Sequence, residues 1–247
     1  FRVIALDRAI KAARIPGVIE TTIQTRSLGV YYNPLSISYE ELVVRLKALE
    51  KEMGELTELP SRLVVIPTWF HDPATIECAK AHGVPDNVEY LAERNNMTVE
   101  EVINTIVSTD YWVTAVGFTP GVTIEMPIDP SKKLSSTQYR SPRTWTPERT
   151  LVLDATGAPN IMPVSSPGGS QMVGRIAVNG YEPDQRNRIF KDDPVLSKVG
   201  DRHRYVSITE EEYREIRKQC DAGTYEYEVE EGIFRLQDYL ELAKKAE

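Results

Sequence analysis

The chain has 247 residues, of which 41% are apolar, enough to fill one large core or two modest ones, and this excludes a miniprotein held together by disulfides. Its 37 acidic and 29 basic residues give a net charge of −8, which argues against a nucleic-acid-binding protein. The two cysteines, Cys78 and Cys220, lack the spacing of metal ligands and favour a reducing compartment, so we expect the cytoplasm. No apolar run reaches the about 18 to 20 residues of a membrane span, and the first residues do not form a signal peptide. Because Phe1 is not an initiator methionine, we expect the chain to begin within a longer polypeptide.

Residues 1–60 are predicted to form a small α+β module with a split βαβ-like order. Its predicted elements are a helix, two strands and a helix, at 2–14, 18–25, 27–32 and 38–53. Pro16 and Gly17 end the first helix, and Ser38 precedes Glu41 by three residues, the spacing of a capping box.

Residues 61–208 are predicted to form a β-barrel or sandwich. Helices are expected over 72–97, where Gly83-Val84-Pro85 interrupts the pattern, and over 98–107, where Thr98 and Glu101 have the spacing of a second capping box. Short strand-like runs with Pro and Gly turns occur at 61–67, 111–117, 150–155, 160–164, 172–178 and 202–208. After 107 the runs follow one another without helices between them, which favours a barrel over βαβ units.

Residues 209–247 are predicted to be a helical, partly exposed tail. A highly charged helix begins after Thr209, a turn follows at 221–224, and a second helix is expected over 234–245. The predicted fold class is therefore α+β, with a small N-terminal module, a β-barrel and a helical C-terminal tail.

Two loops rich in Gly and Pro, at 117–121 and 166–171, each follow a strand-like run. Glycine lets the main chain approach a ligand closely, and successive backbone N–H groups form a concavity suited to a carboxylate or a developing oxyanion. The alternative is that both loops are tight turns of a barrel. Neither loop matches the Walker or dinucleotide-binding pattern.

Four arginines occur beside these loops in an otherwise acidic chain: Arg140, Arg143, Arg149 and Arg175. They could converge on an anionic substrate through bidentate hydrogen bonds, or they could form ordinary surface ion pairs.

Histidine and serine give weaker signals. His71, His82 and His203 have no second ligand at metal-binding spacing, so no metal site is predicted. His71 beside Asp72 could be an oriented base, but we favour Asp72 as the cap of the following helix. No serine has a recognisable base nearby, so we predict no serine nucleophile.

The order of motifs resembles a known family, the one that contains allophanate hydrolase subunit 1, the B subunit of 5-oxoprolinase and the small half of the urea carboxylase carboxyltransferase domain. The shared motifs are Arg26-Ser27-Leu28, Gly117-Phe118 with Pro120-Gly121, Ser141-Pro142-Arg143, Ser166-Pro167-Gly168-Gly169, and Gln171 with Gly174-Arg175. The run from Arg143 through Thr146 to Glu148 is closest to the carboxylase branch. Ile106 stands where the 5-oxoprolinase branch has a histidine, and Ser170 replaces the usual aromatic residue, whereas the loop 117–121 is more similar to the 5-oxoprolinase loop.

The resemblance implies a cyclophilin-like β-barrel and an active site completed by a larger, homologous cyclophilin-like subunit. It implies transfer of a carboxyl group from carboxybiotin to a nitrogen of urea, an amide or a related acceptor. Biotin would be carried on a partner protein, and ATP would be used by a partner biotin carboxylase rather than by this chain. The residues that the resemblance implies in substrate binding are Gly117, Gly121, Arg143, Thr146, Gly168, Gly169, Gln171 and Arg175. No catalytic residue is assigned, and the chain alone is expected to be inactive.

Two alternatives stay open at the level of sequence. One is a subunit of an ATP-dependent 5-oxoprolinase or another lactam or amide hydrolase. The other is a binding protein that inhibits a sensor kinase, as some family members are named. A peptidyl-prolyl isomerase, suggested only by the implied fold, has no site in the sequence to support it.

Overall fold

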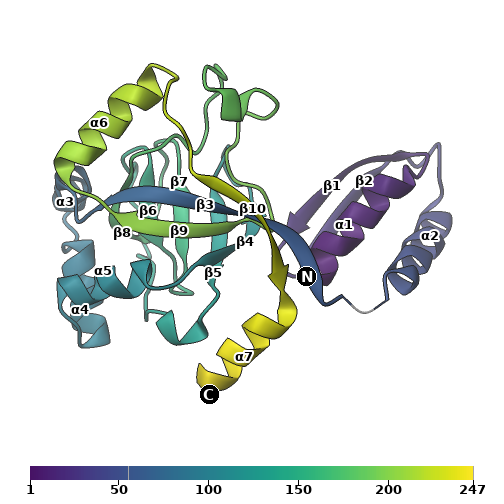
Figure 1. The fold of residues 1–247 in the computed structure, drawn as a ribbon, viewed down its shortest axis with the longest axis horizontal. Helices are drawn as coiled ribbons and strands as arrows, with labels where there is room; N and C mark the ends of the chain where they lie inside the picture. Colours follow the sequence, from purple (N-terminus) through teal and green to yellow (C-terminus); the bar gives the residue numbers. More distant parts are fainter. Residues whose placement is uncertain (55, 247) are drawn as a thin grey trace.

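The chain is described in a computed structural model that covers residues 1–54 and 56–246. Figure 1 shows a small N-terminal module on one side of a barrel-like sheet, with several helices on the opposite side. The module consists of α1 (Arg2–Ala13), β1 (Val18–Gln24), β2 (Ser27–Tyr32) and α2 (Tyr39–Glu52). All four predicted elements of the module are thus confirmed.

Local signals explain the module. The β1 and β2 strands pair as an antiparallel hairpin, and Ile15, Ile37 and Leu42 form a small apolar cluster of their own. The Ser38 hydroxyl accepts a hydrogen bond from the Glu41 N–H at 3.1 Å, so Ser38 caps α2 as predicted.

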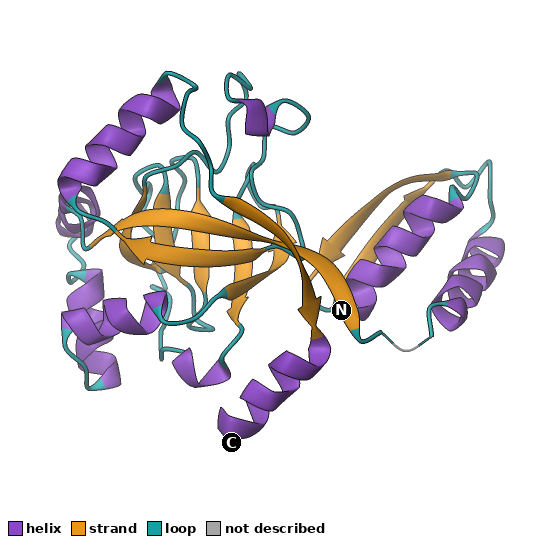
Figure 2. Cartoon of the chain, in the orientation of Figure 1, coloured by secondary structure: helices purple, strands orange, loops and turns teal. Residues whose placement is uncertain are grey.

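The main sheet has eight strands in the order β5-β4-β9-β3-β8-β6-β7, with β10 paired to β3 off this path. These strands are β3 (Glu58–Phe70), β4 (Tyr111–Val116), β5 (Thr123–Pro127), β6 (Thr150–Leu153), β7 (Pro159–Met162), β8 (Gln171–Ile176), β9 (Arg202–Ser207) and β10 (Val229–Arg235). The end strands β5 and β7 meet through side chains, because the Ile161 N–H donates to the Thr123 hydroxyl at 2.9 Å. The sheet is therefore a nearly closed barrel, as the resemblance implies, and Figure 2 shows it as one curved body of strands.

Helices cover one end of the barrel: α3 (Pro73–Ala81), α4 (Asn87–Asn95) and α5 (Val99–Val107). Leu91, Val102 and Ile106 of α4 and α5 are buried in one cluster with strand residues such as Ile66 and Leu151. The predicted capping box is present at the start of α5. Burial of these side chains is the main stabilising contribution in the barrel domain.

The tail differs from the prediction. Its charged helix α6 (Glu210–Asp221) and its last helix α7 (Leu236–Ala246) are present, but the unpredicted strand β10 lies between them, and Phe234 belongs to that strand rather than to a helix. The strand β5 is the other strand that the sequence analysis did not predict. The β10 sequence carries two glutamates and a glycine, which are typical of loops, and only its pairing with β3 makes it a strand.

The remaining elements are the short 3-10 turns η1 (Pro130–Lys132) and η2 (Arg188–Phe190). Within residues 1–54 and 56–246, no helix combines the length and the apolar character needed to cross a membrane. The boundaries at residues 60 and 208 stay predictions.

Candidate functional site

An irregular antiparallel ladder joins two of the segments singled out in the sequence. The segment 139–149 runs along the segment 163–169 through backbone hydrogen bonds of 2.9 to 3.2 Å: Tyr139 N–H to Gly169 O, Arg143 N–H to Gly168 O, Gly168 N–H to Arg143 O, Thr146 N–H to Ser166 O, and Arg149 N–H to Pro163 O. The ladder brings together five of the eight predicted site residues: Arg143, Thr146, Gly168, Gly169 and Gln171.

The two glycines of this ladder have different tolerances. A Cβ atom at Gly169 would lie 3.0 Å from the Tyr139 carbonyl oxygen, so the segments can approach this closely only with glycine there. At Gly168 the nearest atom to a Cβ would be the Thr146 methyl group at 3.7 Å, an ordinary contact. Of the two glycines, Gly169 is therefore the one that the close packing of the two segments requires.

Arg143 lies at the centre of the ladder and is only 2% exposed. Its Nη2 donates to the Ser170 carbonyl oxygen at 2.6 Å, and its guanidinium carbon lies 5.7 Å from the centroid of the Tyr139 ring. Among the described residues its Nε and Nη1 have no hydrogen-bond partner, and Arg143 forms no ion pair. Burial lowers the pKa of this guanidinium, because no carboxylate compensates the loss of water.

Gln171, at the start of β8, is fully buried and follows Ser170, whose carbonyl oxygen binds this guanidinium. Its Nε2 donates to the Thr137 carbonyl oxygen at 2.7 Å, while its Oε1 has no partner in the described part of the chain. The hydroxyl of Ser166, on the facing segment, is also buried and unpaired there. Tyr139, Arg143, Ser166 and Gln171, hereafter the Arg143 cluster, thus hold two unpaired N–H donors and two unpaired oxygens among the described residues, and such buried groups are rare in a folded interior.

Asn87 fixes one wall of the Arg143 cluster. Its Oδ1 accepts from the Met172 N–H at 2.8 Å, and its Nδ2 lies 3.2 Å from the Tyr139 hydroxyl. The start of α4 is therefore tied both to β8 and to the ladder, and this connection orients Tyr139 over the guanidinium.

A cysteine and a histidine that received no role in the sequence analysis contact the ladder at Thr144 and Trp145. The Cys78 thiol is fully buried, 3.5 Å from the Trp145 carbonyl oxygen and 3.8 Å from His82 Nδ1. The ring of His82 packs on Trp145, with 5.3 Å between the centroids. Burial raises the pKa of the Cys78 thiol, so it stays protonated and is a poor nucleophile. The sequence could have indicated that Cys78 and His82 lie close together, because they are four residues apart on a predicted helix and so share one of its faces.

Arg175, the sixth predicted site residue, lies away from the Arg143 cluster. It is four residues further along β8 than Gln171 and opposite Thr150 of β6. Its Nε donates to the buried Asp72 carboxylate at 2.7 Å, and its guanidinium carbon lies 5.1 Å from the centroid of the Tyr213 ring in α6. Asp72 also accepts from the Ala74 N–H at 3.1 Å, so its predicted role as the cap of α3 is confirmed.

Gly117 and Gly121 lie in the loop between β4 and β5, apart from the ladder's Arg143 and Gly169. The Gly117 N–H donates to the Val122 carbonyl oxygen at 2.9 Å, so this N–H is already used within the loop. Gly121 has φ +76°, and a Cβ there would lie 2.9 Å from the Gly180 carbonyl oxygen. The loop is a tight turn packed against the segment around Gly180.

The four arginines near the two loops do not converge on one point. Arg140 is exposed, and Arg149 pairs with Glu148 at 2.5 Å. With Arg175 paired to Asp72, Arg143 is the buried arginine among these four that lacks a carboxylate partner in the described structure, whereas Arg140 lacks one in solvent.

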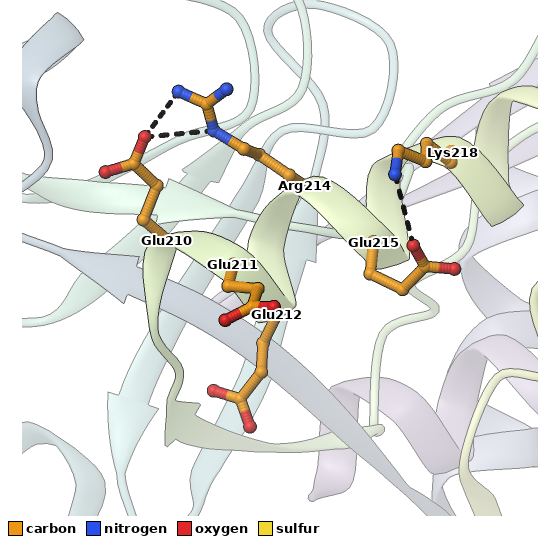
Figure 3. Close-up of a pocket in the computed structure, with 6 residues that line it drawn as sticks. All are labelled: Glu210, Glu211, Glu212, Arg214, Glu215 and Lys218. Carbon is orange, nitrogen blue, oxygen red and sulfur yellow. Dashed lines mark hydrogen bonds and ion pairs between the residues drawn. The ribbon is translucent and has the colours of Figure 1, made fainter.

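The surface of α6 carries a shallow hollow that Figure 3 shows in close-up, lined by Glu210, Glu211, Glu212, Arg214, Glu215 and Lys218. All six residues come from one helix. Its two basic residues are both paired with glutamates, Arg214 with Glu210 and Lys218 with Glu215. It is a solvated helix face, and we assign it no role. Within the described residues, no group of three or more His, Cys, Asp or Glu side chains is arranged to hold a metal ion.

Comparisons with known proteins agree with this architecture. The family model for the carboxyltransferase domain, subdomains C and D, matches residues 1–190. Urea amidolyase of Lachancea kluyveri is 26% identical over 252 residues, which cover 97% of this chain and 14% of that protein. The B subunit of 5-oxoprolinase from Bacillus subtilis is 27% identical over 222 residues, which cover 86% of this chain and 85% of that protein.

Among solved structures, the K. lactis urea amidolyase matches with a TM-score of 0.86 and 25% identity, over 99% of this chain and 15% of that one. The urea carboxylase of Kluyveromyces lactis matches with the same TM-score, and the match covers 23% of that chain. This chain therefore spans only about one seventh of the urea amidolyases that it matches.

Proposed function

The chain belongs to the carboxyltransferase-domain family, subdomains C and D, and from this premise we propose that it is the small half of a biotin-dependent carboxyltransferase resembling urea carboxylase. The reaction would move a carboxyl group to a nitrogen of urea, an amide or a related acceptor. The observation that carries this proposal is the buried Arg143 guanidinium with two N–H donors unpaired among the described residues.

The Arg143 cluster fits the groups that such a reaction brings together. Nε and Nη1 of Arg143 lie on different edges of the guanidinium, so each can donate one hydrogen bond to an oxygen of the reactants, and a bound carboxylate would compensate the buried charge. The Oε1 of Gln171 accepts hydrogen bonds, as the N–H group of urea or an amide requires. When bound, biotin on its carrier supplies the carboxyl group.

The residues of this chain would bind and orient the reactants in a site from which water is excluded. Arg143 would hold the carboxylate and stabilise negative charge on its oxygens, an effect that is strong where water is excluded. Gln171 would orient the acceptor nitrogen. Gly169, with Gly168 and Thr146, would keep the ladder close enough to position both side chains. Gly117, Gly121 and Arg175 take no part in this proposal.

Partners are part of the proposal. We infer a larger homologous cyclophilin-like subunit that completes the active site, a biotin carboxylase that uses ATP, and a biotin carrier. The support is that the chain covers 14% of urea amidolyase of Lachancea kluyveri and 23% of the Kluyveromyces lactis urea carboxylase. The predicted compartment remains the cytoplasm, and the chain alone is expected to be inactive.

A second candidate is a subunit of an ATP-dependent 5-oxoprolinase. It is favoured by one observation, that the match covers 85% of the Bacillus subtilis 5-oxoprolinase B subunit, so the two proteins have similar extents. The presence of Ile106 in place of a histidine expected for that branch argues for the carboxylase instead.

The experiment that separates these candidates is isolation of the protein from its native cells, followed by probing of the co-purifying polypeptides with labelled avidin. A biotinylated partner supports the carboxylase. A larger homologous subunit without biotin supports lactam or amide hydrolysis. A sensor kinase in its place would make the chain an inhibitor.

The role of Arg143 is tested in the reconstituted complex with Arg143→Lys, which keeps the charge but loses the planar guanidinium and its fixed Nε–H donor. We expect kcat/KM for carboxyl transfer to fall about 10- to 100-fold. Arg140→Lys is the matched control, because Arg140 is an exposed arginine three residues away, and its kcat/KM should stay within twofold of the wild-type value. Equal values for the two variants would remove Arg143 from the site.

A further inference from the structure

The loop between β4 and β5 holds an aromatic side chain out of the molecule. Phe118 is 82% exposed and has φ +76°, in the left-handed region that bulky residues rarely adopt. Glycine adopts this conformation without steric conflict, so a phenylalanine here is unfavourable for the backbone.

Nothing in the described part of the chain compensates this conformation. Phe118 takes part in none of the apolar clusters formed by these residues and in none of their aromatic pairs. A local conflict without a gain inside the chain points to an interaction outside it.

The loop is also rigid. The Gly117 N–H donates to Val122 O at 2.9 Å, and the Val122 N–H donates to Thr119 O at 3.1 Å. Gly121 is packed so closely against Gly180 that no side chain fits. The position of Phe118 is therefore fixed before any partner binds, which reduces the entropy lost on binding.

The surrounding hairpin has the composition of an interface. Part of the segment 111–124 is buried in the barrel, and its accessible positions, which include Trp112, Thr114, Val116 and Thr119, carry no charged residue, although 27% of the whole chain is charged. The centres of protein interfaces are depleted of charged residues and enriched in aromatic ones, and a single buried aromatic side chain often dominates the affinity.

We propose that Phe118 is the anchor by which this chain docks onto the second carboxyltransferase half, with its ring inserted into an apolar pocket of that half. This inference rests on the proposed function, because the partner is the larger subunit inferred there. Two observations favour that occupant. The chain spans 14% of a urea amidolyase, and the relative of matching length is named as one subunit of a 5-oxoprolinase.

Substitution by glycine gives the sharpest test, because it removes the side chain and relieves the backbone at once. For Phe118→Gly, we expect the urea midpoint of the isolated chain to equal or exceed that of the wild type. The Kd for the purified larger subunit should rise at least tenfold, and Phe118→Ala should weaken binding similarly. A lowered midpoint with unchanged Kd would show that Phe118 is structural and would overturn the proposal.

Cross-linking identifies the occupant directly. With p-benzoylphenylalanine in place of Phe118, irradiation of the complex should link the chain to the larger subunit. The same replacement at Leu35, which is 95% exposed in the N-terminal module, is the matched control and should give at least tenfold less product. Cross-links only to another copy of this chain would overturn the assignment.

The outcomes separate this inference from the proposed function. If Phe118→Gly weakens binding but the wild-type complex transfers no carboxyl group, the docking inference stands and the proposed function fails. If the wild-type complex transfers carboxyl groups and Phe118→Gly binds as tightly, only the docking inference fails. If the wild-type chain does not bind the larger subunit, both fail.

Discussion

A buried carboxylate network inside the barrel gives a quantitative test of the structure. Glu125 of β5 is fully buried, and its Oε1 accepts from the Thr123 hydroxyl at 2.6 Å and from His203 Nδ1 at 2.9 Å. The Tyr205 hydroxyl lies 2.9 Å from both carboxylate oxygens. Three donors from two strands therefore depend on one acceptor group.

Glu125→Leu keeps much of the side-chain volume but removes every acceptor. If only the His203 N–H and the Tyr205 hydroxyl are counted, two buried donors lose their partner. Each unsatisfied group costs about 1–3 kcal/mol, so the free energy of unfolding should fall by about 2–6 kcal/mol. A typical domain is stable by only about 5–15 kcal/mol, so this loss is easily measured.

A double-mutant cycle sharpens the test. In the wild-type background, Tyr205→Phe removes a hydrogen bond to a charged group and should cost about 1.5–3 kcal/mol. In the Glu125→Leu background the same change removes an unpaired donor, so it should be neutral or stabilising. The destabilisation caused by Tyr205→Phe should thus disappear in the Glu125→Leu background.

Urea unfolding followed by tryptophan fluorescence gives these free energies. Glu100→Leu is the control, because Glu100 is exposed on α5, and its effect should stay within about 0.5 kcal/mol. An equal cost for Tyr205→Phe in both backgrounds, or a loss below about 1 kcal/mol for Glu125→Leu, would refute the network as described.

Three further predictions concern stability. Thr98→Ala removes the capping box of α5 and should lower the free energy of unfolding by about 1 kcal/mol in the same urea assay, whereas an unchanged midpoint would contradict the cap. Gly174→Ala would place a Cβ 2.4 Å from the Trp69 carbonyl oxygen, so we expect little folded protein by circular dichroism, and a native spectrum would contradict this contact. Burial raises the pKa of Tyr111 and Tyr205, so the native state keeps protons that the unfolded state releases above about pH 10. Stability should therefore fall as pH rises through that value, by up to about 1.4 kcal/mol per pH unit for each tyrosine, and a flat profile of urea midpoints from about pH 9 to 11 would argue against their burial.

Elements with local signals could be predicted from the sequence. Ser38, Asp72 and Thr98 each begin a helix because their side chains accept backbone N–H groups only two or three residues away. The strand β10 could not be predicted in this way, since its glutamates and glycine are stabilised as a strand only by pairing with β3, far earlier in the chain.

The same distinction applies to the candidate site. The Gly-Gly motif predicted that the main chain comes close to a ligand, whereas the close approach seen in the structure is within the chain, at Gly169 against the Tyr139 carbonyl oxygen. The motif could not show that Arg143 is buried without a carboxylate while Arg175 pairs with Asp72, 103 residues away in the chain. Which arginine is free depends on tertiary contacts, and these have no counterpart in local spacing.

The pairing of β3 with β10 also has a consequence for biosynthesis. β3 leaves the ribosome long before its partner, because its residues 58–64 pair with residues 229–235, much later in the sequence. Until then part of β3 has an unpaired edge, and such edges promote association between nascent chains. This edge of β3 can therefore be covered only after β10 has left the ribosome, and truncated chains that end before residue 229 should depend on chaperones to stay in solution.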